Sequence, residues 1–141
     1  MTIDVVPVLV AGIAATAVGV SWFVLFAGVL KKIRPLTPAE EEQAQRQMGI
    51  AFAVGVLLTL LMAVVLFHIV TISDAYPAIP VVNGLLTALW VYVGFVMPVQ
   101  ATHIVFGNYG ELETKLKLFG INTGGQLLSL LTMGVVIGLT T

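Results

Sequence analysis

The stretch GINTGGQLLSLLTMGVVIG, residues 120–138, decides the fold of this chain. It is long and apolar enough to cross a hydrocarbon core of ~30 Å as a helix. It also contains five polar side chains, which lipid cannot satisfy. These are Asn122, Thr123, Gln126, Ser129 and Thr132. We therefore expect this helix to lie inside a bundle, with protein on more than one side.

The composition of the whole chain indicates a membrane protein. The 141 residues are 59% hydrophobic and 9% charged, whereas about a quarter of a soluble domain is charged. The length allows one domain, residues 1–141. The absence of cysteine excludes disulfides and thiolate metal ligands, and a net charge of -1 gives no electrostatic reason to expect nucleic acid. The start, MTIDVVPVLV, lacks basic residues, so we expect an uncleaved first span rather than a signal peptide.

Four apolar stretches reach the ~20 residues that a membrane-spanning helix needs. They cover residues 5–30, 48–72, 81–106 and 118–139. The segments between them are rich in charge, proline or glycine, which marks them as loops. We predict an all-α protein, an antiparallel four-helix bundle that is integral to the membrane.

The basic residues predict the orientation of this bundle. All six lie in or beside the first and third loops, and the other loop and both ends of the chain have none. They are Lys31, Lys32, Arg34, Arg46, Lys115 and Lys117. Because positive loops stay in the cytoplasm, we expect the N- and C-termini outside.

The first loop contains a helix start signal. Thr37 is suited to be the N-cap, Pro38 the first helical residue, and Glu40 the acid that completes a capping box. The second helix is therefore predicted to begin at Pro38, before the apolar stretch.

At about 100° per residue, the fourth span has two distinct faces. Its polar stripe contains Asn122, Gln126, Ser129 and Met133. The opposite face contains Gly120, Gly124, Gly134 and Gly138. The amides should face protein or enclosed water, and the glycines should let another backbone approach closely, from this chain or from a second copy.

The third span repeats this pattern with a stripe of Asn83, Thr87, Trp90 and Gly94. Pro98 removes a backbone hydrogen bond and should kink the span. We expect the rings of Trp22 and Trp90 to pack inside the bundle.

The expected depth in the membrane divides the polar residues into an inner and an outer group. An inner-leaflet cluster is the candidate site, either for plain interhelical hydrogen bonds or for a solute or ligand pocket. It contains Trp22, Gln100, His103, Asn122 and Gln126. His68 and Asn83 form a smaller outer pair.

The chemistry available inside the spans is limited. The histidines are the only ionisable side chains well within them, which weighs against proton-coupled transport. His68 and His103 lie near opposite membrane faces, so they cannot ligate one haem iron within a chain, although a symmetric dimer could pair His68 with its copy. No catalytic set and no set of metal ligands is readable, and no cofactor is expected.

Three segments carry a resemblance to a known family. They are SWFVLFAG (21–28), ALWVYVGF (88–95) and LKLFGINTGGQLLSLLTMGVVIG (116–138). The chain resembles small four-helix bacterial membrane proteins of the domain-of-unknown-function family 1761. The family often has an aromatic residue and a histidine where this chain has Gly125 and Gln126, and a Tyr-Ser-Pro-like turn where it has FVLF. The resemblance implies a fold and a multi-pass location in the bacterial cytoplasmic (inner) membrane, but no activity and no role for Gln126.

These features favour a non-enzymatic accessory or structural subunit of a membrane assembly, as a homo-oligomer or within a larger complex. The alternative is a small-solute channel or transporter formed by an oligomer, and an intramembrane enzyme or cofactor-binding subunit is the weaker third. A wet cavity around Asn122 and Gln126 would favour transport. Dry hydrogen bonds from these residues to the third span would favour the accessory subunit.

Overall fold

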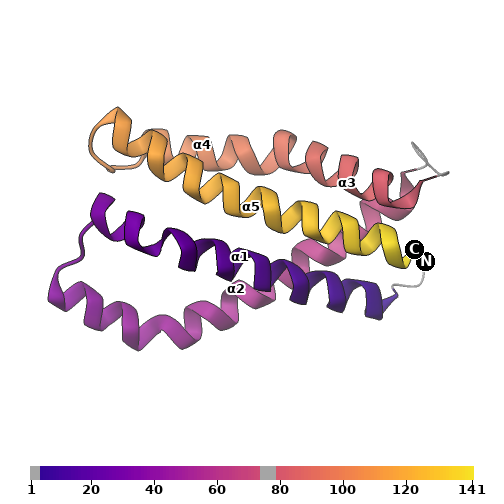
Figure 1. The fold of residues 1–141 in the computed structure, drawn as a ribbon, viewed down its shortest axis with the longest axis horizontal. Helices are drawn as coiled ribbons and strands as arrows, with labels where there is room; N and C mark the ends of the chain where they lie inside the picture. Colours follow the sequence, from indigo (N-terminus) through magenta and orange to yellow (C-terminus); the bar gives the residue numbers. More distant parts are fainter. Residues whose placement is uncertain (1–3, 74–78) are drawn as a thin grey trace.

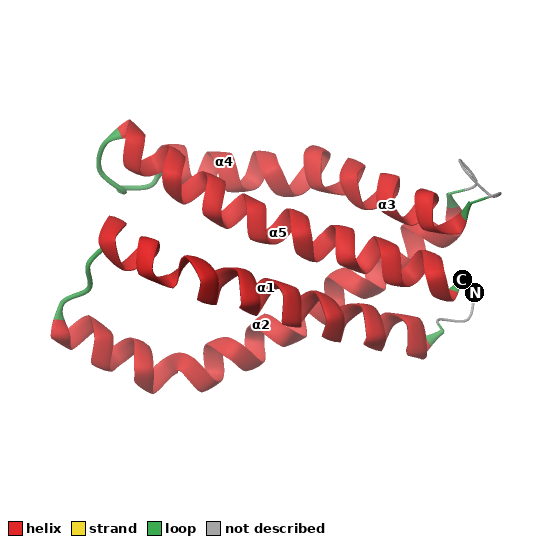
Figure 2. Cartoon of the chain, in the orientation of Figure 1, coloured by secondary structure: helices red, strands yellow, loops and turns green. Residues whose placement is uncertain are grey.

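The computed structural model describes residues 4–73 and 79–141, and nearly all of these residues are helical (Figures 1 and 2). The elements are α1 (Val5–Ile33), α2 (Pro38–Ile72), α3 (Pro80–Val91), the π-helical turn η1 (Tyr92–Val96), α4 (Met97–Phe106) and α5 (Leu112–Thr140). Because α3, η1 and α4 are continuous, the chain has four helices long and apolar enough to cross a membrane. The all-α prediction is confirmed. Residues 1–3, which precede the expected first span, and residues 74–78, in the second loop, lie outside the described residues.

The capping box predicted at the start of α2 is present. The Glu40 backbone N–H donates to Thr37 Oγ1 (3.4 Å), and the Thr37 N–H donates to Glu40 Oε2 (2.8 Å). These two bonds satisfy donors that a helix start otherwise leaves without partners. The helix begins at Pro38, as predicted, about three turns before the apolar stretch 48–72.

Helix α5 is the central element of the bundle. It packs along α1 on one side and along α3 on the other, and it also touches α2 and α4. In Figure 1 the start of α1 and the end of α5 lie at one end of the molecule, and the α1–α2 and α4–α5 loops lie at the other. The largest fully buried side chains are Leu66 of α2 and three residues of α5, Leu130, Met133 and Ile137.

The contact between α3 and α5 is made by glycine backbones. A Cβ added to Gly134 would lie 2.8 Å from the carbonyl carbon of Gly84, and one added to Gly138 would lie 2.5 Å from the Pro80 carbonyl oxygen. Two of the four glycines predicted to form a packing face therefore contact α3 of the same chain. Gly124 lies against the ring of Trp22, and Gly120 has nothing within 4 Å of its added Cβ.

Helix α2 belongs to the bundle only at its far end. Its buried residues are Ala63, Leu66, Phe67 and Val70, whereas residues 38–55 are all exposed. Figure 2 shows the helix bending so that its first half diverges from α1. The C-terminal end is held by Asn83 of α3, which donates to the carbonyl oxygens of Val70 (3.2 Å) and Ser73 (2.9 Å).

The two hydrogen bonds of Asn83 also change the interpretation of His68 and Asn83, which were expected to form a polar pair. His68 does not bond to Asn83, because its Nδ1 lies 2.8 Å from the Val64 carbonyl oxygen of its own helix. Asn83 instead satisfies carbonyls that the end of α2 leaves free.

The prediction that the Trp90 ring packs inside the bundle is wrong. On the stripe that it shares, Asn83 and Thr87 are buried, but Trp90 is 74% exposed and Gly94 is exposed too. Asn83 meets the end of α2, whereas Trp90 and Gly94 lie two and three turns further along the stripe. Trp90 therefore does not pack inside the bundle.

Pro98 is the second residue of α4 and follows the π-helical turn after one intervening residue, Met97. A proline in a helix has no N–H to donate to the carbonyl four residues earlier. Residues Tyr92–Val96 adopt the wider π geometry, and the Met97 N–H donates to the Tyr92 carbonyl oxygen. The structure thus has an irregular helical turn next to the proline where the sequence predicts a kink.

Replacing two glycines of α5 by alanine should have effects of opposite sign. Gly134→Ala should lower the free energy of unfolding by about 1–3 kcal/mol, because its methyl group meets the α3 backbone. Gly120→Ala should be neutral or raise it by up to about 1 kcal/mol, because the methyl group meets nothing and alanine favours the helix. Titration with SDS in mixed micelles measures both values, and equal effects of the two variants would contradict the close α3–α5 contact.

Candidate functional site

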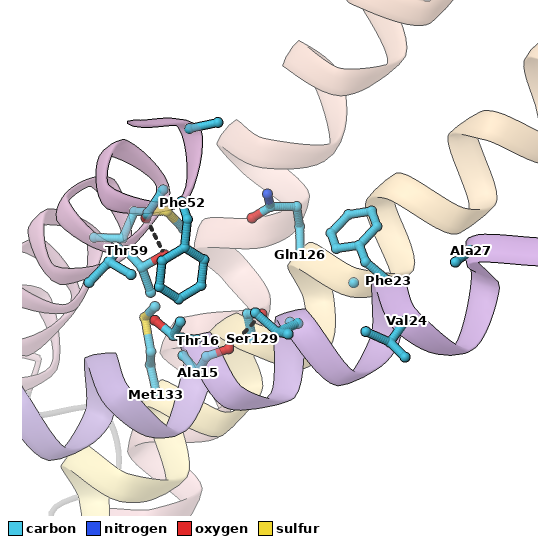
Figure 3. Close-up of a pocket in the computed structure, with 17 residues that line it drawn as sticks. Ala15, Thr16, Phe23, Val24, Ala27, Phe52, Thr59, Gln126, Ser129 and Met133 are labelled. Carbon is cyan, nitrogen blue, oxygen red and sulfur yellow. Dashed lines mark hydrogen bonds between the residues drawn. The ribbon is translucent and has the colours of Figure 1, made fainter. Parts of the chain in front are cut away.

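A cavity with polar side chains in its wall lies between α1, α2 and α5 (Figure 3). Its volume is about 470 Å³, within the ~300–1,000 Å³ range of small-molecule sites. Apolar side chains form most of its wall, among them Phe23 of α1, Phe52 of α2 and Met133 of α5. Figure 3 shows the Gln126 side chain projecting from α5 toward these residues.

Small residues and the divergence of α2 together leave this space open. Gly19 of α1, and Ala51 and Gly55 of α2, contribute little volume to the wall. A Cβ added to Gly55 would have no atom within 4 Å. Phe52 is 57% exposed and Val24 is 70% exposed, so the cavity is open to the surroundings of the bundle.

Gln126 differs from the other polar side chains of the wall in its hydrogen bonding. Thr16 donates to the Gly12 carbonyl oxygen and Thr59 to that of Gly55, each at 2.8 Å. Ser129 donates across to the Ala15 carbonyl oxygen of α1 at 3.3 Å. Within residues 4–73 and 79–141, the amide of Gln126 has no such partner, and it is half-buried.

Trp22 links α1 to α5 beside this cavity. Its indole N–H donates to the Ile121 carbonyl oxygen at 2.8 Å. The ring lies against two glycines, since an added Cβ would come within 2.8 Å of it at Gly124 and within 2.7 Å at Gly125. The ring of Phe26 also packs against the Trp22 ring, and the two ring centroids are 4.6 Å apart. Trp22 thus has a structural partner for its one polar atom.

The five residues of the expected inner cluster do not line a common cavity. Gln126 lines the cavity described above, and Trp22 lines a separate groove of α1 and α5. Asn122 lines a third cavity of about 320 Å³ near Arg34. Gln100 is half-buried and His103 is exposed, with its ring centroid 5.9 Å from that of Tyr109.

The arrangement offers little acid–base or metal chemistry. No ionisable side chain lines the cavity that contains Gln126. In the part of the chain that the structure describes, no three histidine, aspartate or glutamate side chains come together as a metal site. His68 lies near the C-terminal end of α2, and His103 lies in the last turn of α4.

Sequence reasoning missed the contribution of α2 to this cavity. Phe52, Gly55 and Thr59 line it, together with Ala51. The spacing Ala51, Gly55 and Thr59 is a run of small residues four apart, which marks helix contact faces in membranes. This signal was present in the sequence, within an otherwise apolar stretch.

Fold and cavity together define a small helical protein with four helices long and apolar enough to cross a membrane. A family described as "Protein of unknown function (DUF1761)" matches residues 6–138, nearly the whole chain. The chain belongs to this family, and the resemblance noted in its sequence is confirmed. No curated protein and no solved structure matches it significantly.

The Trp22 contact predicts a measurable loss of stability. Trp22→Phe should lower the free energy of unfolding by about 1 kcal/mol or more, because the indole N–H bond to Ile121 and part of the ring contact are lost. Phe95→Leu is the matched control, since Phe95 is 71% exposed and should change stability by about 0.5 kcal/mol or less. A Trp22→Phe variant as stable as the native protein in SDS titration would show that this bond is not formed.

Proposed function

We propose that the four helices run antiparallel across a bacterial cytoplasmic (inner) membrane, with both termini outside. The supporting observation is the distribution of positive charge over the fold. All six basic residues belong to the ends of helices that flank the α1–α2 and α4–α5 loops, and none belongs to the opposite end within residues 4–73 and 79–141. Positively charged loops are retained in the cytoplasm during insertion.

Single cysteines test this orientation, because the chain has none of its own. In intact cells, a membrane-impermeant maleimide should label Thr141→Cys and leave Lys32→Cys unlabelled. Permeabilised cells provide the control, where both variants should react. Labelling of Lys32→Cys from outside intact cells would reverse the proposed topology.

We further propose that the protein is a non-enzymatic structural or accessory subunit that assembles in the membrane with a second copy of itself. The observation that supports this proposal is Trp90. It lies near the middle of the helix Pro80–Phe106, its side chain is 74% exposed, and its ring N–H has no partner among the described residues. Acyl chains cannot accept a hydrogen bond, and tryptophan in membrane proteins prefers the interfaces.

The surface around Trp90 suits a second copy. Gly94 lies one turn further along the same stripe, and nothing approaches its added Cβ within 4 Å. In a two-fold interface, residue i of one copy meets residue j of the other and the reverse. A bulky ring and a glycine one turn apart are self-complementary, because each Trp90 can fill the space over the other copy's Gly94. Small residues of this kind permit close helix contact in lipid.

The two alternatives receive less support. A solute path needs polar side chains along one cavity, whereas Asn122 and Gln126 line different cavities, and the larger one has a mostly apolar wall. Neither residue hydrogen-bonds to α3 within the described part of the chain, so the self-association proposal depends on Trp90 and Gly94. An enzyme would need an acid, a base or a nucleophile in the cavity, and the proposal assigns none.

Self-association can be measured by energy transfer between labelled copies in liposomes. Trp90→Leu and Gly94→Leu should each weaken it about 30-fold or more, the equivalent of the ~2 kcal/mol typical of a central interface residue. Gly28→Leu is the control, because Gly28 is exposed on α1 and also meets nothing within 4 Å. Association that is absent in the native protein, or equally strong in Trp90→Leu and Gly28→Leu, would overturn the proposal.

A further inference from the structure

Among the described polar side chains that line the cavity between α1, α2 and α5, only the Gln126 amide has no hydrogen-bond partner (Figure 3). Thr16, Thr59 and Ser129 all donate to backbone carbonyls, as described above. Every deeply buried polar side-chain atom in the described residues has a partner, so the Gln126 amide must be accessible from the cavity. An amide offers two N–H donors and one carbonyl acceptor.

The position of Gln126 along α5 makes an amide without a hydrogen-bond partner unusual. It is the middle residue of α5 (Leu112–Thr140), about 20 Å from either end at 1.5 Å per residue. At such a depth lipid tails surround the bundle, and a polar group without a partner there costs several kcal/mol. An occupant of the cavity that hydrogen-bonds to the amide would remove this cost.

The wall of the cavity restricts what this occupant can be. No charged side chain lines it, so a charged ligand would have no counter-ion. The aromatic and aliphatic side chains Phe23, Phe52 and Met133 favour an apolar body. The ester groups of a phospholipid stay near the interface, about 15 Å from the middle of a ~30 Å hydrocarbon core, and so do not reach Gln126.

The divergence of α1 and α2 provides an entry path. Wall residues of both helices are exposed, with Val24 at 70% and Phe52 at 57%. These side chains belong to membrane-spanning helices, so the opening faces lipid rather than water. A molecule dissolved in the bilayer can therefore enter sideways, while a polar solute has no comparable route.

We propose that this cavity is a binding site for a neutral, bilayer-dissolved molecule with an apolar body and a carbonyl or hydroxyl oxygen that hydrogen-bonds to Gln126. Isoprenoid quinones and long-chain alcohols have this chemistry. Gln126 orients the oxygen, and the residues of α1 and α2 hold the apolar part. The site is separate from the Trp90 surface, so it stands or fails independently of self-association.

The test is the melting temperature of the purified full chain in mild detergent, with decylubiquinone, tetradecanol or tetradecane added. A ligand that binds only the folded state should raise the melting temperature saturably, by several degrees at ~100-fold excess over its Kd. Decylubiquinone supplies carbonyl oxygens, tetradecanol a hydroxyl, and tetradecane no polar group. We expect a saturable rise with the quinone or the alcohol and none with the alkane.

Three variants separate the amide from the shape of the cavity. Gln126→Leu should abolish the rise, and Gly55→Leu should also abolish it by taking up space in the cavity, since a Cβ added to Gly55 has no atom within 4 Å. Gln100→Leu removes an amide that does not line this cavity and should keep the native response. A rise with the quinone alone assigns a carbonyl ligand, and a rise with the alcohol alone assigns a hydroxyl ligand.

Three results would overturn the proposal. One is the absence of a saturable shift with any probe in the native protein. Another is an equal shift with tetradecane, which would mean that acyl chains alone fill the space. The third is an undiminished shift in Gln126→Leu, provided that this variant shows the same helical circular dichroism as the native protein. If Gln126→Leu does not fold, Gly55→Leu takes its place in the test, and an undiminished shift of the melting temperature in Gly55→Leu overturns the proposal.

Discussion

The structure depends on the close approach of two backbones, those of α3 and α5. In lipid, no hydrophobic force brings helices together, so contact must come from packing and hydrogen bonds at short range. Gly84, Gly134 and Gly138 allow the two helices to meet without intervening side chains. Once α5 is fixed on α3, its other side is available to α1, where Trp22 and Ser129 bond to backbone carbonyls of the facing helix. The remaining elements are arranged around this central helix.

Helix α2 shows what happens where such a contact is missing. Asn83 holds its end through two carbonyl oxygens, and its last turns contribute Leu66 and Phe67 to the core. Its first half is exposed, is linked to α1 by the exposed ion pair between Lys31 and Glu41 (3.9 Å), and diverges (Figure 2). The cavity that contains the Gln126 amide lies between this diverging part of α2 and the helices α1 and α5.

The sequence predicted the helices better than their contacts. Thr37 and Glu40 form a local motif, and their capping box could be foreseen because it involves neighbouring residues only. The number of spans followed from length and hydropathy. The bend of α2 could not be foreseen, because in a membrane the faces toward lipid and toward protein are equally apolar. For the same reason the ring of Trp90 was expected inside the bundle, although Asn83 and Thr87 of the same stripe are buried.

The π-helical turn at Tyr92–Val96 has a consequence for how this span is compared with others. A π turn holds about one residue more than an α turn, which sets every later residue back by about 100° around the axis relative to a regular α-helix. A helical wheel drawn through residues 80–106 as one α-helix therefore misassigns the angular phase of its second part, including Gln100 and His103. Residues 80–91 and 97–106 need separate wheels, and deletion of one residue within the turn could restore a regular α-helix without rotating the two halves against each other.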